Sequence, residues 1–243
     1  MSDMQKIRAN TELPRRSEEI TLQTDDGLTL VGELSLPAHR DPAATLVTFH
    51  PLPTQGGFMD SHILRKAAWR LPAMADIAVL RFNTRGTSSP RGTSEGTFGD
   101  GITERYDVAA AMRFAEQRGL PHIWQLGWSF GTELLLKYGL DYPADGTILL
   151  SPPLHRTTAS ELARWHGAGR RLIAVIPEND DFLRPPEARE RFSVVPETEL
   201  IVIPDGRHLW IGEKQTREVL TVIVRAMRPS ALPLPTEWPT PSE

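Results

Sequence analysis

Hydrophobic residues recur along this chain in two alternating forms, short apolar runs and longer segments with a periodic apolar face. The runs are nearly continuous, which is typical of strands buried on both faces of a sheet. The periodic segments repeat their apolar residues at the spacing of a helix with one buried side. The runs predict strands at 43–50, 77–83, 123–126, 146–151, 171–176 and 199–203. The periodic segments predict helices at 61–75, 102–118, 130–138, 158–165, 186–192 and 213–227.

A different pattern precedes these elements, because apolar and polar residues alternate one by one near the N-terminus. Residues 19–24 and 28–36 alternate in this way and are joined by Asp25-Asp26-Gly27, so they predict an antiparallel hairpin. From residue 43 onward, strands alternate with helices, which predicts a mostly parallel sheet. The predicted fold class is therefore α/β, with a mostly parallel eight-stranded sheet flanked by helices.

The domain organisation follows from length and from one shift in composition. With 243 residues and 40% hydrophobic content, the chain is long enough for one large core, which we assign to residues 18–228. Residues 1–17 form an N-terminal arm. Residues 229–243 form a tail whose five prolines exclude a helix or a central strand. We expect this tail to be an extended arm with a disordered end rather than a partner-binding segment.

Composition also excludes several classes of function. A net charge of −4 gives no basic excess for binding nucleic acid or an acidic membrane surface. No apolar run has the length of a membrane span, and the first ten residues lack the apolar core of a signal peptide, so we expect a cytoplasmic protein. The absence of cysteine rules out disulfides, thiolate metal sites and a cysteine nucleophile. The glycine-rich run 96–101 lacks the fingerprint of a nucleotide site, and we expect no cofactor and no metal.

The strongest chemical signal is the sequence Gly127-Trp128-Ser129-Phe130-Gly131, which stands between a predicted strand and a leucine-rich predicted helix. A sharp strand-to-helix turn exposes a serine hydroxyl at the end of the strand, and small flanking residues let the two backbones pass closely. The start of the helix also favours negative charge at this point. The pattern therefore predicts Ser129 as a nucleophile.

A serine nucleophile needs a neighbouring imidazole, and that imidazole needs an acid that orients it. Three histidines follow Ser129 in the sequence, and of these His208 stands in the loop that leaves the last predicted strand. The acid is expected at another strand end, and the loop after strand 171–176 offers Asp180, with Asp181 as the alternative. Loops at the carboxyl ends of parallel strands converge, so these residues can meet.

The remaining site candidates lie around this expected triad. The backbone amides of Phe130 and Leu52 are candidates for holding an oxyanion; Pro51 and Pro53 have no N–H to offer. The candidates for contact with the substrate are His50, Phe58, Leu154 and Trp210. Trp128 is assigned to the core, since the residue before the nucleophile points away from the pocket.

Residues 18–228 resemble the serine α/β-hydrolase family. The resemblance rests on the Gly-x-Ser-x-Gly motif, the His50-Pro51 turn, the run Arg81-Phe82-Asn83-Thr84-Arg85-Gly86, Asp180 and His208. The His-Pro turn and the Arg-Phe-Asn run are similar to a small bacterial subgroup often grouped with dienelactone hydrolases and prolyl-oligopeptidase-type domains. Pro51 replaces the glycine usual in the family's oxyanion turn.

The resemblance implies a serine hydrolase that cleaves a small carboxylic ester or thioester through an acyl-enzyme on Ser129. About twenty residues separate the strands near 150 and 171, so we expect no lid domain and an open site. Its walls are expected at 51–60, 86–101 and 152–160. The alternatives are a peptidase or acyltransferase on the same triad, and a non-catalytic interaction module of the same fold. The expected partner is a small-molecule acyl substrate, and the sequence also allows a homodimer.

Overall fold

The computed structural model describes residues 4–240, and its centre is an eight-stranded sheet in the order β11-β10-β9-β8-β4-β5-β3-β2. All neighbours from β11 to β5 are parallel, whereas β3 pairs antiparallel with β5 and with β2. The predicted α/β class and mostly parallel eight-stranded sheet are confirmed. The strands are β2 (Arg15–Gln23), β3 (Thr29–Pro37), β4 (Ala44–Phe49), β5 (Ile77–Phe82), β8 (Ile123–Trp128), β9 (Gly146–Leu150), β10 (Arg171–Pro177) and β11 (Glu199–Ile203).

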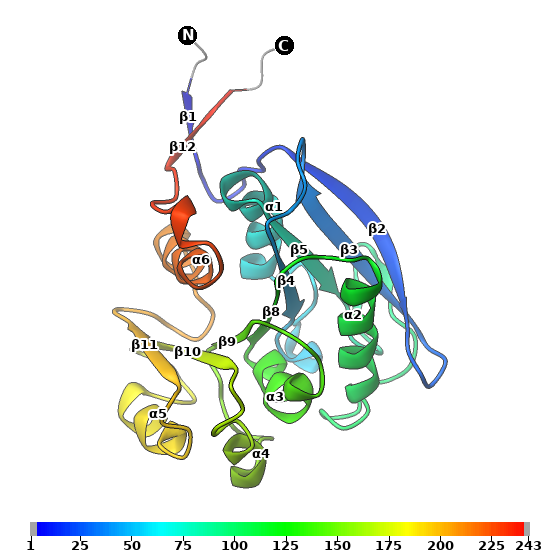
Figure 1. Cartoon of the computed structure of the whole chain (residues 1–243), viewed down its shortest axis with the longest axis vertical. Helices are drawn as coiled ribbons and strands as arrows, with labels where there is room; N and C mark the ends of the chain where they lie inside the picture. The colour runs from blue at the N-terminus through cyan, green and yellow to red at the C-terminus, as the bar shows by residue number, and fades with distance from the viewer. Residues whose placement is uncertain (1–3, 241–243) are drawn as a thin grey trace.

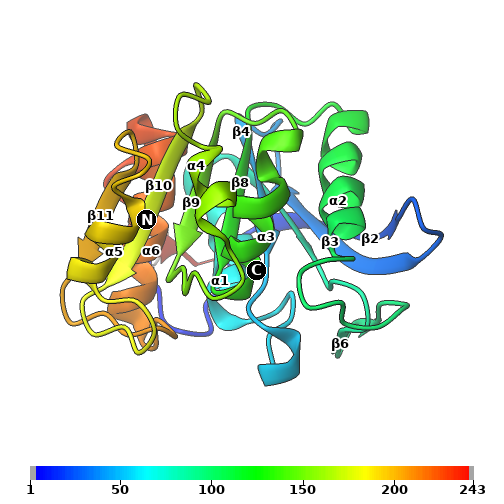
Figure 2. The same ribbon diagram turned by 90° about the horizontal axis from the view of Figure 1, so that it is seen from below.

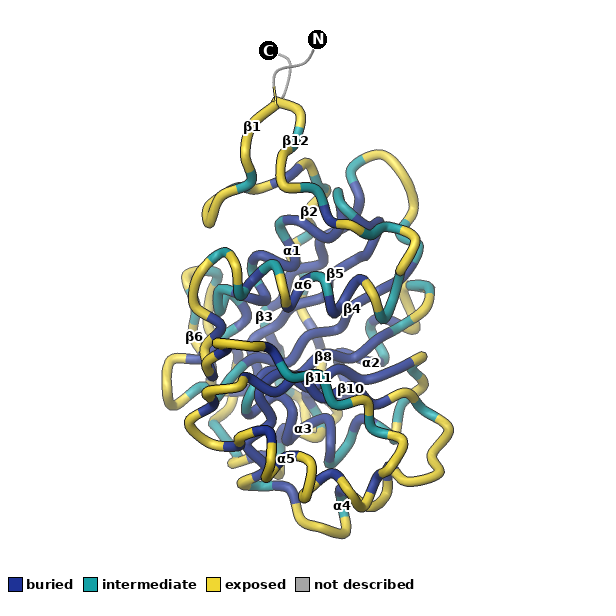
Figure 3. Tube along the Cα trace, turned by 90° about the vertical axis from the view of Figure 1, so that its left-hand side faces the viewer, coloured by how far each residue is buried: buried dark blue, intermediate teal, exposed yellow. Residues whose placement is uncertain are grey.

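Helices cover both faces of this sheet (Figure 1). One face packs on α1 and α6, and the other on α2, α3, α4 and α5, with a separate apolar core on each side. The strands β4 and β5 are buried along their whole length (Figure 3), and so is β9, which explains why their sequences are continuous apolar runs. The α-helices are α1 (His62–Ala75), α2 (Arg105–Gln117), α3 (Phe130–Tyr138), α4 (Ala159–Ala163), α5 (Pro185–Phe192) and α6 (Glu213–Met227).

The connection from β9 to β10 holds only the short helix α4 (Figure 2), so no lid covers this end of the sheet. The loops that follow β4, β8, β9, β10 and β11 all leave the carboxyl ends of neighbouring parallel strands. The topology therefore brings residues from five distant parts of the sequence to one edge of the sheet. Within residues 4–240 no helix combines the length and the apolar character needed to cross a bilayer.

The two ends of the described chain lie next to each other. The short strands β1 (Met4–Lys6) and β12 (Glu237–Pro239) pair with each other and project past α1 and α6 (Figure 1). The first residues of the predicted tail form the 3-10 turn η3 (Pro229–Ala231). The predicted N-terminal arm likewise already contains β1 and the start of β2. Residues 1–3 and 241–243 of the arm and tail lie outside the described residues.

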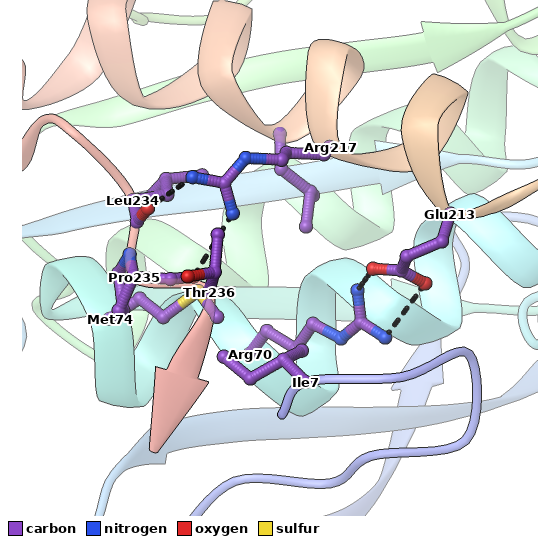
Figure 4. Close-up of a pocket in the computed structure, with 9 residues that line it drawn as sticks. Ile7, Arg70, Met74, Glu213, Arg217, Leu234, Pro235 and Thr236 are labelled. Carbon is purple, nitrogen blue, oxygen red and sulfur yellow. Dashed lines mark hydrogen bonds and ion pairs between the residues drawn. The ribbon is translucent and has the colours of Figure 1, made fainter. Parts of the chain in front are cut away.

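The tail is held by contacts with the last helix. Leu234 is buried in the core formed with α1 and α6, and the Arg217 guanidinium donates hydrogen bonds to the carbonyls of Leu234 and Pro235 (Figure 4). Nearby, the buried Arg70 guanidinium pairs with Glu213 at the start of α6. The Arg217 guanidinium and one apolar anchor thus hold the tail against α6.

Four further short elements complete the described chain. They are the hairpin of β6 (Ser88–Ser89) and β7 (Gly92–Thr93), and the 3-10 turns η1 (Pro53–Gln55) and η2 (Gly139–Asp141). The η1 turn lies in the loop after β4, and the hairpin lies in the loop after β5. Both loops contribute to the surroundings of the site described next.

Candidate active site

Ser129 stands at the sharp turn between β8 and α3. Its backbone has φ 52° and ψ −113°, a conformation that is strained for a residue with a side chain. Close packing forces this turn: a Cβ on Gly131 would lie 2.1 Å from the Phe49 carbonyl oxygen, and one on Gly127 would lie 2.5 Å from Gly131. The spacing of the two glycines around the serine therefore has a steric cause.

His208 and Asp180 come together with this serine. The His208 Nε2 atom lies 2.9 Å from the Ser129 Oγ atom, and the His208 Nδ1 atom lies 3.0 Å from Asp180 Oδ2. A carboxylate only accepts hydrogen bonds, so Nδ1 carries the proton and Nε2 is free to accept one from the serine. The three residues leave the ends of β8, β10 and β11, and thus the sheet sets their spacing.

The acid of this arrangement is Asp180 and not Asp181. Asp180 is buried, and its Oδ1 atom also accepts the amides of Phe182 and Leu183, at 2.8 and 3.3 Å. Asp181 is exposed to solvent. The Phe182 ring packs edge-on against the His208 imidazole, with 4.5 Å between ring centroids. The imidazole is thereby fixed by a carboxylate on one edge and by an aromatic ring on its face.

The backbone of His208 is also held in place. Its carbonyl accepts a hydrogen bond from the Trp128 indole at 3.1 Å and another from the Ser151 hydroxyl at 3.2 Å. Trp128 is buried in the core, as the sequence predicted, while Ser151 was missed because it follows β9 in an otherwise apolar stretch. Two neighbouring strands thus fix the loop that carries the imidazole.

The two candidate oxyanion amides come from two different loops. Phe130 is the first residue of α3, and Leu52 directly precedes η1 in the loop after β4. Among residues 4–240, neither of these backbone N–H groups donates a hydrogen bond. The side chain of Phe130, by contrast, is buried in the core.

His50 does not line a pocket, contrary to the prediction of substrate contact. Its side chain is 1% exposed, its Nε2 atom accepts the Thr84 amide at 3.0 Å, and its Nδ1–H donates to the Pro51 carbonyl at 2.7 Å. Burial lowers the pKa of His50 to about 4, so the imidazole is neutral. Since the C=O and N–H of a trans peptide point in opposite directions, holding the Pro51 carbonyl also orients the Leu52 amide.

The loop after β5 reinforces the same region. The Asn83 side-chain oxygen accepts the Met59 amide at 2.9 Å, and the Arg81 guanidinium donates to Asp60 at 2.6 Å. Arg81 is fully buried and also pairs with Glu33 on β3. The run Arg81-Phe82-Asn83-Thr84 therefore acts as a scaffold for the loop after β4.

Of the other three substrate candidates, two are buried in the core and one lines a groove. Trp210 is fully buried in the core beside α1 and α6, so it does not contact the site surface. Leu154 is 4% exposed and belongs to the core on the opposite face. Phe58 does line a groove of about 410 Å³, but none of Ser129, Asp180 and His208 lines it. The residues that line this groove are Pro51, Gln55, Gly56, Gly57, Phe58, Asp60, Ser61, His62, Arg65, Trp128, Leu209 and Ile211.

A residue that sequence reasoning missed also supports the loop after β9. Glu133, in the first turn of α3, is fully buried and accepts the amides of His155 and Arg156 at 2.7 and 3.1 Å. It also accepts the hydroxyl of Thr157. The only signal in the sequence was a carboxylate four residues after the serine, directly before three leucines.

We compared the chain with known proteins. No protein-family model and no curated protein matches the sequence. A lidless serine hydrolase from Xanthomonas campestris shares the structure with a TM-score of 0.72 and 24% identity, over 93% of this chain and 100% of that one. A serine hydrolase homologue from Coxiella burnetii gives a TM-score of 0.72 with 21% identity, over 88% and 99%. An esterase from Pyrococcus furiosus gives 0.67 with 19% identity, over 88% and 94%.

The Xanthomonas structure is described as an α/β serine hydrolase without a lid, which agrees with the short connection from β9 to β10 and with the resemblance inferred from the motifs. The chain has the fold of the lidless α/β serine hydrolases.

Proposed function

We propose that the protein is a serine hydrolase that cleaves a carboxylic ester or thioester through an acyl-enzyme on Ser129. The observation that carries the proposal is the unbroken series of hydrogen-bond distances from Asp180 through His208 to the Ser129 hydroxyl. An esterase among the structures with the same fold, and a site without a lid, support the same reaction class.

The chemistry follows from the tautomer that Asp180 imposes. His208 Nε2 takes the hydroxyl proton while Ser129 Oγ bonds to the carbonyl carbon of the ester, and negative charge forms on the carbonyl oxygen. The unpaired amides of Phe130 and Leu52 are the donors available to that oxyanion. The carbon–oxygen or carbon–sulfur bond then breaks, and the leaving group takes the proton from His208. Water repeats the cycle on the acyl-enzyme and releases the acid.

Labelling with a fluorophosphonate probe, followed by peptide mapping, tests this proposal. We expect an adduct on Ser129 that is lost in Ser129→Ala and in His208→Ala. Hydrolysis of p-nitrophenyl butyrate should fall by about 10⁴-fold in Ser129→Ala while the fold remains intact. Turnover retained in that variant would contradict the assignment.

A substrate panel separates the related functions. Short p-nitrophenyl esters, acyl-CoA thioesters and aminoacyl amides, each with and without an added alcohol acceptor, distinguish an esterase or thioesterase from a peptidase or acyltransferase. A well-folded protein that neither labels nor turns over any member of the panel would instead be a non-catalytic interaction module.

A further inference from the structure

We propose that Phe182 and His155 form the wall of the site that receives the alcohol arm of the substrate, and that this wall selects esters whose alcohol carries an aromatic ring. The inference rests on the proposed function and adds the chemical class of the alcohol. Its basis is the contact of Phe182 with the imidazole of the triad, together with the exposure of the rest of its ring.

The Phe182 side chain contacts a member of the triad directly. Its ring centroid lies 4.5 Å from that of the His208 imidazole, and its backbone amide donates to Asp180 Oδ1 at 2.8 Å. The same side chain is 50% exposed, whereas the next residue, Leu183, is 2% exposed and belongs to the core. Phe182 therefore presents apolar surface to solvent beside the imidazole.

A second ring extends this surface. The His155 imidazole packs against the Phe182 ring, with 5.5 Å between the centroids and 83° between the ring planes. His155 is exposed and follows β9, while Phe182 follows β10 and His208 follows β11. The three rings thus form a row over the ends of three neighbouring strands, with Phe182 in the middle.

This wall is rigid because both of its loops are anchored in the body of the protein. The buried Glu133 carboxylate accepts the His155 amide at 2.7 Å, and Arg191 on α5 donates to the Leu154 carbonyl at 3.2 Å. The loop after β10 is anchored by the two amides that donate to Asp180. A surface that is fixed before binding has little ordering to lose when a ligand covers it.

The chemistry of the reaction brings the alcohol arm to this wall. When the acyl-enzyme forms, the carbon–oxygen bond breaks and the leaving oxygen takes the proton from His208 Nε2, so that oxygen lies within hydrogen-bond distance of the imidazole. Because the two ring centroids are 4.5 Å apart, the leaving oxygen lies no farther than about 9 Å from the Phe182 centroid, whatever its direction of approach. A phenyl group joined to this oxygen by two carbons is long enough to contact Phe182.

Matched esters test this inference. 2-Phenylethyl acetate and ethyl acetate differ by a phenyl group on the alcohol arm, and ethyl 3-phenylpropanoate and ethyl propanoate differ by the same group on the acyl arm. All four are esters of primary alcohols, so their leaving groups have similar basicity. We expect kcat/KM to be roughly ten-fold higher for 2-phenylethyl acetate than for ethyl acetate, since aromatic contact and apolar burial contribute about that much. The ratio within the acyl pair should be smaller.

Three variants assign the preference to Phe182. In Phe182→Ala the ratio within the alcohol pair should fall toward one, whereas Phe182→Tyr, which keeps an aromatic ring, should retain it. Phe114→Ala should also retain it, because this half-buried ring lies near the end of α2, toward the amino ends of the strands. If Phe182 only positioned the triad, Phe182→Ala would lower kcat/KM equally for all four esters and leave the ratio unchanged.

Acyl transfer to an added alcohol gives a second measurement, which needs only the wild type. An alcohol that attacks the acyl-enzyme retraces the path of a leaving alcohol, by microscopic reversibility. With p-nitrophenyl acetate as donor and equal concentrations of 2-phenylethanol and ethanol, we expect 2-phenylethyl acetate to be the main ester formed.

The outcomes separate this inference from the proposed function. Equal rates within the alcohol pair, a ratio that survives Phe182→Ala, a preference confined to the acyl pair, or equal transfer to the two alcohols would overturn the inference. Hydrolysis of the esters in those cases would leave the proposed function standing. No hydrolysis of any ester, together with no labelling of Ser129, would count against the function itself.

Discussion

Strained backbone in this protein is concentrated at single residues around the candidate site. Of the eight non-glycine residues with positive φ in the described part of the chain, five lie in the loops after β8, β9 and β11: Ser129, Ser151, Leu154, Asp205 and Trp210. Such conformations persist only where the surrounding structure over-determines them. Hydrogen bonds to the His208 carbonyl and close glycine packing supply that constraint here.

The burial of His50 predicts that the protein loses stability as the pH falls. Its pKa is lowered by burial from 6.5 to about 4, so the folded protein binds fewer protons than the unfolded chain between these pH values. The contribution of this group to stability is therefore complete above pH 6.5 and is lost as pH falls toward 4. The slope is about 1.4 kcal/mol per pH unit.

His50→Gln keeps an acceptor for the Thr84 amide but cannot titrate. Between pH 7 and pH 5, we expect the free energy of unfolding of the wild type to fall by about 2 kcal/mol more than that of the variant. Urea unfolding at both pH values measures this, and the other titrating groups cancel in the comparison. Parallel pH dependences of the two proteins would show that His50 is not neutral in the folded state.

Single residues also show where sequence reasoning succeeds. Ser129, His208 and Asp180 could be placed because each directly follows a strand, and the parallel sheet fixes where strand ends meet. Whether His50 or Trp210 faces a pocket or the core depends on partners far away in the sequence, namely the loop after β5 and the helices α1 and α6. No local pattern encodes such a partner.

At the scale of elements, the long periodic segments were predicted within a few residues of their observed ends. The helix expected at 61–75 is α1, and the strand expected at 171–176 is β10. The pairs β1 with β12 and β6 with β7 were not predicted, because strands of two or three residues are too short to show a hydrophobic period. They exist only through pairing, which for β1 and β12 spans almost the whole chain.

The hydrogen bond from Trp128 on β8 to the loop after β11 can be tested with a matched control. Trp128 and Trp165 are both 2% exposed, and each indole donates to a backbone carbonyl at 3.1 Å, of His208 and of Leu136 respectively. We expect Trp128→Phe to lower kcat on p-nitrophenyl butyrate by about ten-fold, the equivalent of one lost hydrogen bond. Trp165→Phe should lower the thermal midpoint by about as much as Trp128→Phe does, and it should leave kcat near that of the wild type.

The readout that separates positioning from stability is the rate of fluorophosphonate labelling of Ser129. It should slow in Trp128→Phe and stay unchanged in Trp165→Phe. Equal effects of both substitutions on labelling and kcat would mean that Trp128 acts only as core.

For the molecule as a whole, the C-terminal segment is part of the core and not an appendage. Leu234 is 4% exposed and packs with α1 and α6, so Leu234→Ala should destabilise the protein by about 2–4 kcal/mol. Leu209→Ala, at a leucine that is 51% exposed, should cost about 0.5 kcal/mol or less. The free energies of unfolding of both variants can be measured by chemical unfolding. A tail that contributes nothing would give the two variants equal stability.

The ribbon of β1 and β12 brings the two ends of the described chain together. Met4 lies opposite Pro239, so the first and last described strands are direct neighbours. A short linker between them would close the chain into a ring, and the ring could be opened at the exposed glycines 167 and 169 between α4 and β10. Such a circular permutant would keep every strand neighbour of the sheet and the spacing of Ser129, Asp180 and His208, although β10 would now come first. The site thus depends on which strands are adjacent in space and not on where the polypeptide starts.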